Sequence, residues 1–277
     1  MFAPYRYLGS RQPAVLSELH LVLAFIIAGP DGNAAWDGKY PLANEAAGSD
    51  GAAFLQRLDG EIARLRAKGG DIAISFGGEG GQELALTAAD APALESNYET
   101  VIDRYRLTWM DLDVEGDALA NRAANERRNR ALAALQARHP DLRITFTLPV
   151  EPDGLSPDSL SLLQDAAGKG VRIAAVNLMI MDYAPRFLAN GDAMGALGIR
   201  AAQRAHAQCT KWAPKLAFGL TPMIGANDEL GQYFTTGDAT AVCAWARKQP
   251  WICWLSYWSL NRDDGSYARI FRRFSTR

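Results

Sequence analysis

Apolar and polar residues alternate along one short stretch of the chain, from Leu107 to Gly116. A two-residue period is typical of a β-strand, because successive side chains of a strand point to opposite faces. The alternation places three carboxylates on one face, those of Asp111, Asp113 and Glu115. Both flanking segments have helical patterns, which favours a central strand whose acidic face points into the protein. A solvated edge strand is the alternative.

The rest of the chain alternates between strand-like and helix-like segments. Strands are predicted at residues 2–7, 20–28, 71–76, 107–116, 143–148, 174–181, 216–223 and 254–259. Helices are predicted at residues 13–19, at about 50–68, in a region ending near 105, at 117–138, from 156 onward, and at 192–212, 238–248 and 267–274. These helices follow apolar spacing and capping signals. Residues 29–44 are predicted to form a polar loop.

Eight strands that alternate with helices, without a break in composition, indicate parallel βαβ units. Eight such units close naturally into a (β/α)₈ barrel, the TIM barrel, so we expect a single α/β domain over residues 1–277. A doubly wound open sheet is the alternative. The first strand is not followed by a GxGxxG turn, and the glycines from Gly77 to Gly81 lack the lysine of a P-loop. These absences disfavour nucleotide binding.

Composition and charge narrow the function further. The chain is 48% hydrophobic and 22% charged, as in soluble globular proteins, and its formal net charge is −2. This balance gives no electrostatic reason to expect nucleic acid or an anionic membrane as partner. The richest apolar run, Leu19 to Ala28, has the length of a strand and is too short to span a membrane.

The cysteines and histidines show no recognisable site. The three cysteines, Cys209, Cys243 and Cys253, are odd in number and lack the spacing of zinc ligands. A bond between Cys243 and Cys253 stays open. The three histidines are scattered along the chain, which gives neither a metal cluster nor an obvious catalytic triad.

The acidic strand is therefore the main candidate for chemistry. Three carboxylates in a poorly solvated space cannot all be ionised at low cost, so at least one must share a proton or have a raised pKa. Such an arrangement is typical of acid–base catalysis.

Other candidate residues stand at the carboxyl ends of the predicted strands, where barrels of this kind carry their reactive groups. They are Ser75, Gly77 and Gly78 after the third strand, Glu115 after the fourth, Asn177, Met179, Met181, Asp182 and Tyr183 at the sixth, Thr221, Pro222, Met223, Asn227 and Asp228 at the seventh, and Tyr257 and Trp258 at the eighth. An acidic centre among methionine and aromatic side chains suits a sugar ring, whose C–H face stacks on aromatic rings. Packing inside a barrel is the alternative for each of these residues taken alone.

These positions resemble the motifs of bacterial chitinases of glycoside hydrolase family 18. Ser75-x-Gly77-Gly78 matches the third-strand motif of that family, and Asp111-x-Asp113-x-Glu115 matches the end of its DxxDxDxE signature. The segment Met179–Tyr183 resembles the sixth-strand motif, and Trp258 falls where the family has its eighth-strand tryptophan. The DxDxE spacing is the most specific of these matches.

The resemblance implies endo-hydrolysis of β-1,4 linkages in chitin or chitooligosaccharides by a retaining, substrate-assisted mechanism. Glu115 would be the general acid and later the base, Asp113 would orient the N-acetyl group, and Asp111 would help to set the protonation of Asp113. The implied substrate-binding residues are Ser75, Gly77, Gly78, Met179, Met181, Asp182, Tyr183, Met223, Asn227 and Trp258. The mechanism requires no cofactor and no metal.

The chain departs from the family pattern at two positions. Thr108 replaces the first Asp of the signature, which is the residue farthest from the chemistry. Met181 stands where the common pattern has a tyrosine that donates to the N-acetyl oxygen, and the tyrosine of this chain follows as Tyr183. Loss of one such donor costs about 3 kcal/mol of transition-state stabilisation, so we expect an active but slower or narrower hydrolase.

Two other functions stay open: an endo-β-N-acetylglucosaminidase acting on N-glycans, and a non-catalytic chitin-binding protein. About thirty residues separate Met223 from Trp254, too few for the inserted α+β subdomain of some related chitinases, which favours a shallow, open groove. No signal peptide is recognisable after Met1, so we expect either an intracellular protein or a mature domain. A polymeric substrate favours secretion, and carbohydrate-binding modules could be attached in a longer protein.

Overall fold

The computed structural model describes residues 1–9, 16–42, 50–189 and 191–275. Two compact units are described separately below. The N-terminal unit comprises residues 7–145 and 161–173, and the C-terminal unit comprises residues 1–6, 146–160 and 174–277. Strand β7 (Arg143–Pro149) and helix α6 (Pro157–Gly168) each pass from one unit into the other.

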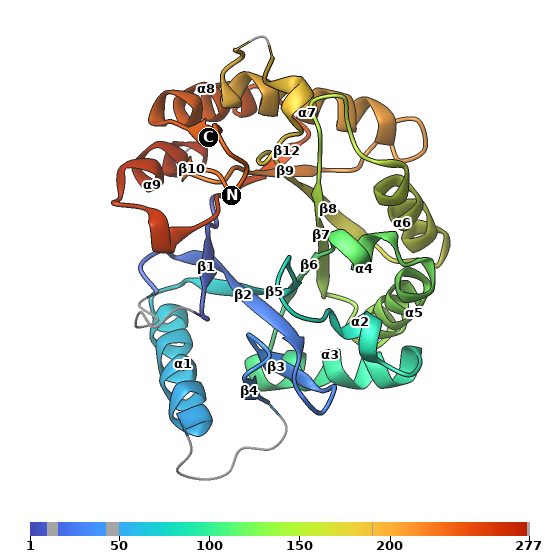
Figure 1. The fold of residues 1–277 in the computed structure, drawn as a ribbon. Coiled ribbons are helices and arrows are strands. Elements are labelled where there is room, and N and C mark those ends of the chain that lie inside the picture. The colour runs from blue at the N-terminus through green and yellow to red at the C-terminus, as the bar shows by residue number, and fades with distance from the viewer. Residues whose placement is uncertain (10–15, 43–49, 190, 276–277) are drawn as a thin grey trace. The chain divides into compact units, whose positions relative to one another are not determined.

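The N-terminal unit is built on a mostly parallel sheet (Figure 1). Its strands, in spatial order, are β6 (Trp109–Asp113), β5 (Asp71–Gly77), β2 (His20–Ala28), β3 (Ala34–Trp36) and β4 (Tyr40–Pro41). β6, β5 and β2 are parallel, whereas β3 and β4 are antiparallel additions. β2 coincides with the continuous apolar run of the sequence, and most of its residues are buried, as expected for a strand covered on both faces.

Five helices of this unit follow from local sequence signals. They are α1 (Asp50–Ala67), α2 (Leu84–Thr87), α3 (Ala91–Tyr105), α4 (Gly116–Ala120) and α5 (Arg122–Arg138). The apolar positions of α1, from Leu55 to Leu65, are buried at helical spacing, which confirms the predicted amphipathic helix. The Asp90 side chain accepts the Ala93 N–H at 2.8 Å and so caps the start of α3.

The single helix predicted over 117–138 is wrong in one respect, because it is two helices. Asn121 has an extended backbone between α4 and α5, and its side chain accepts the Ala124 N–H at 3.0 Å. An asparagine in this role starts a new helix, which interrupts the alanine- and arginine-rich segment near its beginning.

Two further expectations need correction. The predicted loop over residues 29–44 contains β3 and β4, because the apolar segment around Trp36 pairs back onto β2 and the Trp36 indole donates to the Tyr105 hydroxyl at 2.8 Å. Of the helix predicted at 13–19, residues 13–15 lie outside the described residues. Residues 16–19 are not helical, because the chain there runs into the sheet and the Leu19 carbonyl accepts the Asp71 N–H.

The C-terminal unit also has a parallel sheet, in the order β12 (Ile252–Leu255), β9 (Phe218–Thr221) and β8 (Ile173–Met179). Its helices are α7 (Met194–Cys209), α8 (Thr236–Ala246) and α9 (Ser266–Phe271), with short 3₁₀ turns η1 (Pro185–Phe187), η2 (Leu260–Arg262) and η3 (Arg272–Phe274). A small antiparallel hairpin, β10 (Gly225–Ala226) and β11 (Tyr233–Phe234), was not predicted. The first residues of β1 (Tyr5–Tyr7) belong to this unit, where the Tyr5 N–H donates to the Tyr257 carbonyl.

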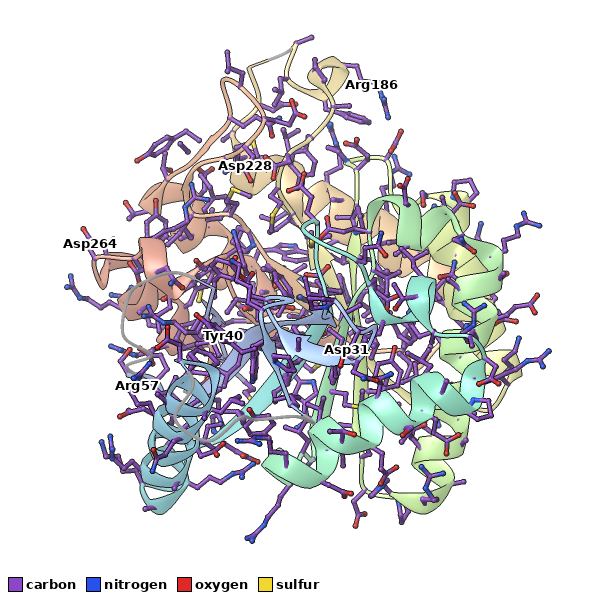
Figure 2. All side chains as sticks on the ribbon, turned by 60° about the horizontal axis from the view of Figure 1, so that its bottom comes forward. Asp31, Tyr40, Arg57, Arg186, Asp228 and Asp264 are labelled. Atoms are coloured by element: carbon purple, nitrogen blue, oxygen red, sulfur yellow. The ribbon has the colours of Figure 1, made fainter. Side chains whose placement is uncertain are left out.

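The two units together confirm the predicted α/β class with parallel strands. Figure 2 shows charged side chains such as Arg57, Arg186 and Asp264 projecting outward from the ribbon, while the apolar side chains of the strands are buried. Among the described residues, no helix combines the length and the apolar character needed to cross a membrane.

Candidate active site

The acidic strand β6 has no exposed face. Met110, Leu112 and Val114 have no exposed surface, and on the opposite side Asp111 is 0% and Asp113 4% exposed. The predicted inward-facing acidic strand is therefore confirmed, and the solvated edge strand is wrong.

Asp111 is held by two hydroxyl groups from the neighbouring strands of the N-terminal unit. The Ser75 hydroxyl of β5 donates to Asp111 Oδ2 at 2.8 Å, and the Thr145 hydroxyl donates to Asp111 Oδ1 at 2.6 Å. The register of β5 and β6 sets Ser75 directly beside Asp111. The indole N–H of Trp109 in turn donates to Thr145 Oγ1 at 3.0 Å. Sequence reasoning found Ser75 but missed Thr145 and Trp109.

Asp113 lies one step farther along the strand and has an unusual protonation. Burial first, and then the charges of Glu115 and Asp111 and a hydrogen bond with Glu115, raise the pKa of Asp113 well above its ordinary value. Its Oδ1 atom is buried and has no hydrogen-bond partner among the described residues. Asp113 therefore holds a proton at pH values where an exposed aspartate is ionised, as the sequence predicted for at least one of the three acids.

Glu115 is the only one of the three acids with appreciable exposure. It follows the end of β6 and occupies the N-cap position of α4, where its side chain makes no capping hydrogen bond. Since Gly116 directly after it has a positive φ of 52°, the chain turns sharply at this point. A partly exposed carboxyl beside a buried, protonated one can exchange protons with a bound ligand.

Gly77 and Gly78 bring the end of β5 close to the acidic strand. Both have positive φ, and a Cβ on Gly77 would lie 2.1 Å from the Asp113 carbonyl oxygen, while one on Gly78 would lie 2.8 Å from the Phe25 ring. The Gly78 N–H donates to the Asp113 carbonyl at 3.0 Å. We expected these glycines to allow close approach to a ligand; in the structure Gly77 allows close approach to β6, and Gly78 allows close approach to the Phe25 ring of β2.

A buried ion pair supports the loop after Gly78. The Arg128 guanidinium of α5, which is 0% exposed, donates to Glu83 Oε2 at 2.8 Å and, through Nε, to Oε1 at 3.4 Å. The same arginine donates to Asn125, whose side chain donates to the Leu119 carbonyl of α4. Glu83 also caps α2 by accepting the Ala85 N–H. Arg128 thus joins the loop after β5 to the short helix that begins after Glu115.

Seven of the predicted sugar-binding residues belong to the C-terminal unit. They are Met179, Met181, Asp182, Tyr183, Met223, Asn227 and Trp258. The other six predicted site residues, Ser75, Gly77, Gly78, Asp111, Asp113 and Glu115, belong to the N-terminal unit and are brought together there.

The segment around Asp182 is held by the loop between β9 and α8. The Asp182 carboxylate accepts the Glu229 N–H at 2.9 Å, and the Asp182 N–H donates to Asn227 Oδ1 at 3.3 Å. Gln232 accepts the Tyr183 N–H at 2.9 Å and donates to the Tyr183 carbonyl at 2.6 Å. Burial raises the pKa of Asp182. The Tyr183 ring has no exposed surface, and its hydroxyl has no hydrogen-bond partner among the described residues.

Trp258 lies shortly after the end of β12, the last strand of the C-terminal unit. It pairs with Met223 in a parallel bridge, and its backbone N–H donates to the Pro222 carbonyl at 2.8 Å. Its ring is partly exposed and lies edge-on to the Tyr5 ring, with 6.0 Å between the ring centroids. A partly exposed indole in a fixed backbone position suits stacking against a flat ligand face.

Two of the strand-end candidates are structural. The Thr221 hydroxyl donates to Asn177 Oδ1 at 2.9 Å, and Asn177 donates to Thr147 Oγ1 at 3.1 Å, within a fully buried network that also includes the Tyr5 hydroxyl. These polar side chains are hydrogen-bonded to one another, which is the usual condition of buried polar side chains.

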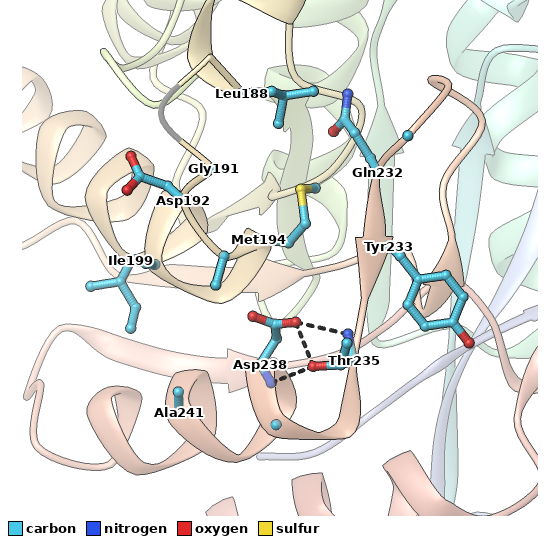
Figure 3. A pocket seen from close by; sticks show the side chains of 14 residues that line it. Leu188, Gly191, Asp192, Met194, Ile199, Gln232, Tyr233, Thr235, Asp238 and Ala241 are labelled. Carbon is cyan, nitrogen blue, oxygen red and sulfur yellow. Dashed lines mark hydrogen bonds between the residues drawn. The ribbon is translucent and has the colours of Figure 1, made fainter.

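A separate cavity of about 700 Å³ lies in the C-terminal unit (Figure 3). Residues of α7, α8 and β11 line it, together with Leu188 and Asp192. Asp238 at its edge accepts the N–H groups of Gly195 and Thr235 and the Thr235 hydroxyl. None of the predicted site residues lines this cavity.

The described part of the chain contains no group of three or more His, Cys, Asp or Glu side chains arranged to hold a metal ion. Cys209, Cys243 and Cys253 form no disulfide bond in the structure. The pairing of Cys243 with Cys253 that the sequence left open is therefore absent.

Comparison with known proteins gives two similar curated sequences. The chain is 32% identical over 263 residues to the "Probable bifunctional chitinase/lysozyme" of Escherichia coli (strain K12), covering 88% of this chain and 28% of that protein. It is 32% identical over 269 residues to "Endochitinase 11" of Metarhizium anisopliae, covering 88% of this chain and 47% of that protein. The chain thus spans less than half the length of these relatives. No known family model matches it.

Solved structures agree. Active domain 2 of the thermostable chitinase from Pyrococcus furiosus, complexed with chito-oligosaccharides, is 27% identical with a TM-score of 0.84, covering 99% of this chain and 94% of that one. A GH18 chitinase from Pseudoalteromonas aurantia shares the fold at 18% identity, with a TM-score of 0.70 and 99% coverage of both chains. The chain is therefore similar in sequence to curated chitinases and in fold to solved chitinases, one of them of glycoside hydrolase family 18, and the resemblance predicted from its motifs is confirmed.

Proposed function

We propose that the chain is a chitinase domain that cleaves β-1,4 linkages within chains of N-acetylglucosamine and retains the configuration at the anomeric carbon. The observation that carries this proposal is the partly exposed Glu115, just after the end of β6, close to the buried, proton-holding Asp113. The chito-oligosaccharides bound to the related chitinase from Pyrococcus furiosus support the choice of substrate.

In the first step, Glu115 donates its proton to the oxygen between two sugars. The carbonyl oxygen of the substrate's own N-acetyl group attacks the anomeric carbon as the bond to the leaving sugar breaks. The products of this step are the protonated leaving sugar, a cyclic oxazolinium ion and an ionised Glu115. No protein side chain forms a covalent bond.

In the second step, the Glu115 carboxylate removes a proton from water, and the resulting hydroxide adds to the anomeric carbon. The oxazolinium ring opens, and Glu115 regains the proton that it lost. Asp113 has the role of orienting the N-acetyl group and stabilising the positive charge of the ring. The proton on Asp113 can move to the neighbouring acids, Asp111 or Glu115, and back as this charge develops and disappears.

The seven residues of the C-terminal unit carry sugar-binding roles through the family resemblance. The partly exposed indole of Trp258 suits the floor of a sugar subsite. The family tyrosine is missing, since Met181 stands in its place. Tyr183 has no exposed surface, so it would contact a sugar only after its neighbours move. We therefore expect transition-state stabilisation to be about 3 kcal/mol weaker than with the usual tyrosine.

The experiment is hydrolysis of a hexamer of N-acetylglucosamine, followed by mass spectrometry of the products. Glu115→Gln should abolish the release of reducing ends while calorimetric binding of the hexamer persists. Glu126→Gln, an exposed position on α5, is the matched control and should hydrolyse like the wild type. Wild-type protein that binds the hexamer without cleaving it would indicate a non-catalytic chitin-binding protein. Cleavage of a high-mannose glycoprotein instead of the hexamer would indicate an endo-β-N-acetylglucosaminidase.

A second variant tests the substrate-assisted route. Asp113→Asn should lower turnover of the hexamer by about 100-fold or more, because the N-acetyl group and its developing charge lose their partner. Unaltered turnover would contradict substrate assistance. Nuclear magnetic resonance of the fresh product reports whether the anomeric configuration is retained.

We also propose the finer features that accompany this function: a closed (β/α)₈ barrel, secretion, and attached carbohydrate-binding modules. Alternating strands and helices with parallel pairing support the barrel. A polymeric substrate supports secretion, and the greater length of the curated relatives leaves room for further modules.

A further inference from the structure

Two side chains, those of Trp109 and Thr145, lead to Asp111 through consecutive hydrogen bonds. Trp109 precedes Asp111 by two residues on β6, and its indole contacts the Thr145 hydroxyl, which contacts Asp111 Oδ1. All three residues are buried and belong to the N-terminal unit. The mechanism described above uses neither Trp109 nor Thr145.

The direction of each hydrogen bond follows from the chemistry of the groups. An indole N–H can only donate, so Thr145 Oγ1 must accept from Trp109. The Thr145 proton then has two acceptors within reach: Asp111 Oδ1 at 2.6 Å and the Met110 carbonyl at 3.3 Å. The shorter contact is the favoured one, and short O–H···O distances are typical of an ionised acceptor.

Both oxygens of Asp111 therefore receive a hydroxyl proton, one from Thr145 and one from Ser75. Two donors stabilise the ionised form of a carboxylate and leave a protonated form with its own hydrogen poorly placed. Asp113 has a different setting, because its Oδ1 atom has no partner among the described residues. A proton shared by the two acids is thus better placed on Asp113.

The other groups near Asp111 do not reverse this preference. The titratable groups of its own segment are Asp113 and Glu115, and the charges of Glu115 and Asp111 both raise the pKa of Asp113. The hydroxyl groups of Ser75 on β5 and Thr145 on β7, which donate to Asp111, are neutral. The Arg143 guanidinium lies over the Trp109 ring, 4.7 Å from its centroid.

We propose that Thr145 and Trp109 are positioning residues that keep Asp111 ionised and thereby direct the shared proton to Asp113. Thr145 supplies the hydroxyl donor. The indole N–H of Trp109 orients this hydroxyl by donating a hydrogen bond to the Thr145 oxygen. The proposal rests on the chitinase function proposed above, because the proton held by Asp113 is the one that the substrate-assisted mechanism uses.

The test compares Thr145→Val, Thr145→Ser and Trp109→Phe. Thr145→Val keeps the shape of the side chain and removes the donor, Thr145→Ser keeps the donor, and Trp109→Phe keeps a ring but removes the N–H. Titration of ¹³C-labelled aspartate carboxyl groups, assigned with Asp111→Asn and Asp113→Asn, gives the protonation of each acid directly.

In Thr145→Val, Asp111 should titrate about one pH unit higher than in the wild type, which is a roughly tenfold change in proton affinity. Thr145→Ser should restore the wild-type titration, and Trp109→Phe should give a smaller shift in the same direction. Equal titration of Asp111 in the wild type and Thr145→Val would overturn the proposal.

The pH profile of kcat/KM for the hexamer provides a second readout. The acidic limb should move upward by about one pH unit in Thr145→Val, with the basic limb in place. A loss of activity that is uniform across pH, accompanied by a lower Tm, would show a merely structural role and would also overturn the proposal. If wild-type protein does not cleave the hexamer, the chitinase proposal fails, whereas the carboxyl titration still reports on Thr145 and Trp109.

Discussion

The buried carboxylates of the N-terminal unit have two different kinds of partner. Glu83 is 4% exposed and faces the buried guanidinium of Arg128 at 2.8 Å. The acids of β6 are equally buried, yet their partners are neutral hydroxyls and other acids. A cation keeps a proton off its partner carboxylate, whereas neutral and acidic neighbours favour keeping one. The ion pair of Glu83 stabilises the fold, whereas the acids of β6 keep a proton on Asp113.

The same contrast appears in the direction of the pKa shifts. Burial is the largest single effect on Arg128 and lowers its pKa, but the charges and hydrogen bonds of Glu83 and Tyr98 together outweigh it, and the pKa is raised. For Asp113, burial and the acidic neighbours act in the same direction, and the pKa rises well above the ordinary value. Four predictions test this difference.

Breaking the ion pair should have the largest effect. Arg128→Met leaves Glu83 buried without a cation, and we expect the free energy of unfolding to fall by about 3–5 kcal/mol. Urea unfolding followed by circular dichroism measures it. The matched control is Arg130→Met on the same helix, whose contact with Glu126 is 4.0 Å long and largely exposed, and which should change stability by about 0.5 kcal/mol or less. A loss below about 1 kcal/mol for Arg128→Met would contradict the role of the pair.

Removing both charges should restore part of that loss. In Glu83→Gln combined with Arg128→Met, the amide can still accept the Ala85 N–H, and no buried charge is left alone. We expect the double variant to be about 1–3 kcal/mol more stable than Arg128→Met. A double-mutant cycle in urea provides the measurement, and strictly additive effects would count against coupling of the two residues.

The stored proton predicts a pH dependence of stability. Because the pKa of Asp113 is raised by folding, only the unfolded chain loses this proton as pH rises above the ordinary value of 3.8, so the fold loses stability until the raised folded pKa is reached. The loss is at most about 1.4 kcal/mol per pH unit. Asp113→Asn removes this pH-dependent loss of stability.

Relative to the wild type, Asp113→Asn should therefore gain about 1 kcal/mol or more in unfolding free energy between pH 4 and pH 7. Urea unfolding at several pH values measures this gain. The fully exposed Asp264 has a pKa lowered by hydrogen bonds from Ser266, so Asp264→Asn should show no such gain. A pH-independent difference between wild type and Asp113→Asn would contradict the raised pKa.

The smallest effect is expected at Asn121, which stands between the helix that begins after Glu115 and the helix that carries Arg128. Asn121→Ala removes the cap of α5 and should cost about 1 kcal/mol of stability. Thermal unfolding measures this cost. Turnover of the hexamer should stay close to that of the wild type, and a large loss of turnover would mean that the cap also positions Glu115.

The acidic strand could be predicted because its signal is local. Alternation over ten residues specified which side chains share a face, and helical flanks indicated that the strand is central. The split between α4 and α5 was missed, because a single asparagine decides it within a segment of strong helix formers. The hairpin β10–β11 was missed because each of its strands has only two residues.

Contacts between distant residues could not be predicted. Thr145 lies 34 residues from Asp111 in the chain, and Arg128 lies 45 residues from Glu83. The helix α5 contains five arginines, and no feature of the sequence distinguishes the buried Arg128 from the other four. Strand-end positions identified Ser75 for the same site, because the register of parallel strands follows from their order.

The loop between β10 and β11 suits protein engineering. Leu230 at its tip is 97% exposed, whereas the base of the loop is anchored by the bonds of Asn227, Glu229 and Gln232 to the Asp182 segment. Exposed loop tips accept inserted segments readily when the surrounding backbone is well held. A fluorescent reporter grafted at Leu230 would leave these anchoring bonds intact and could be exchanged without redesigning the rest of the protein.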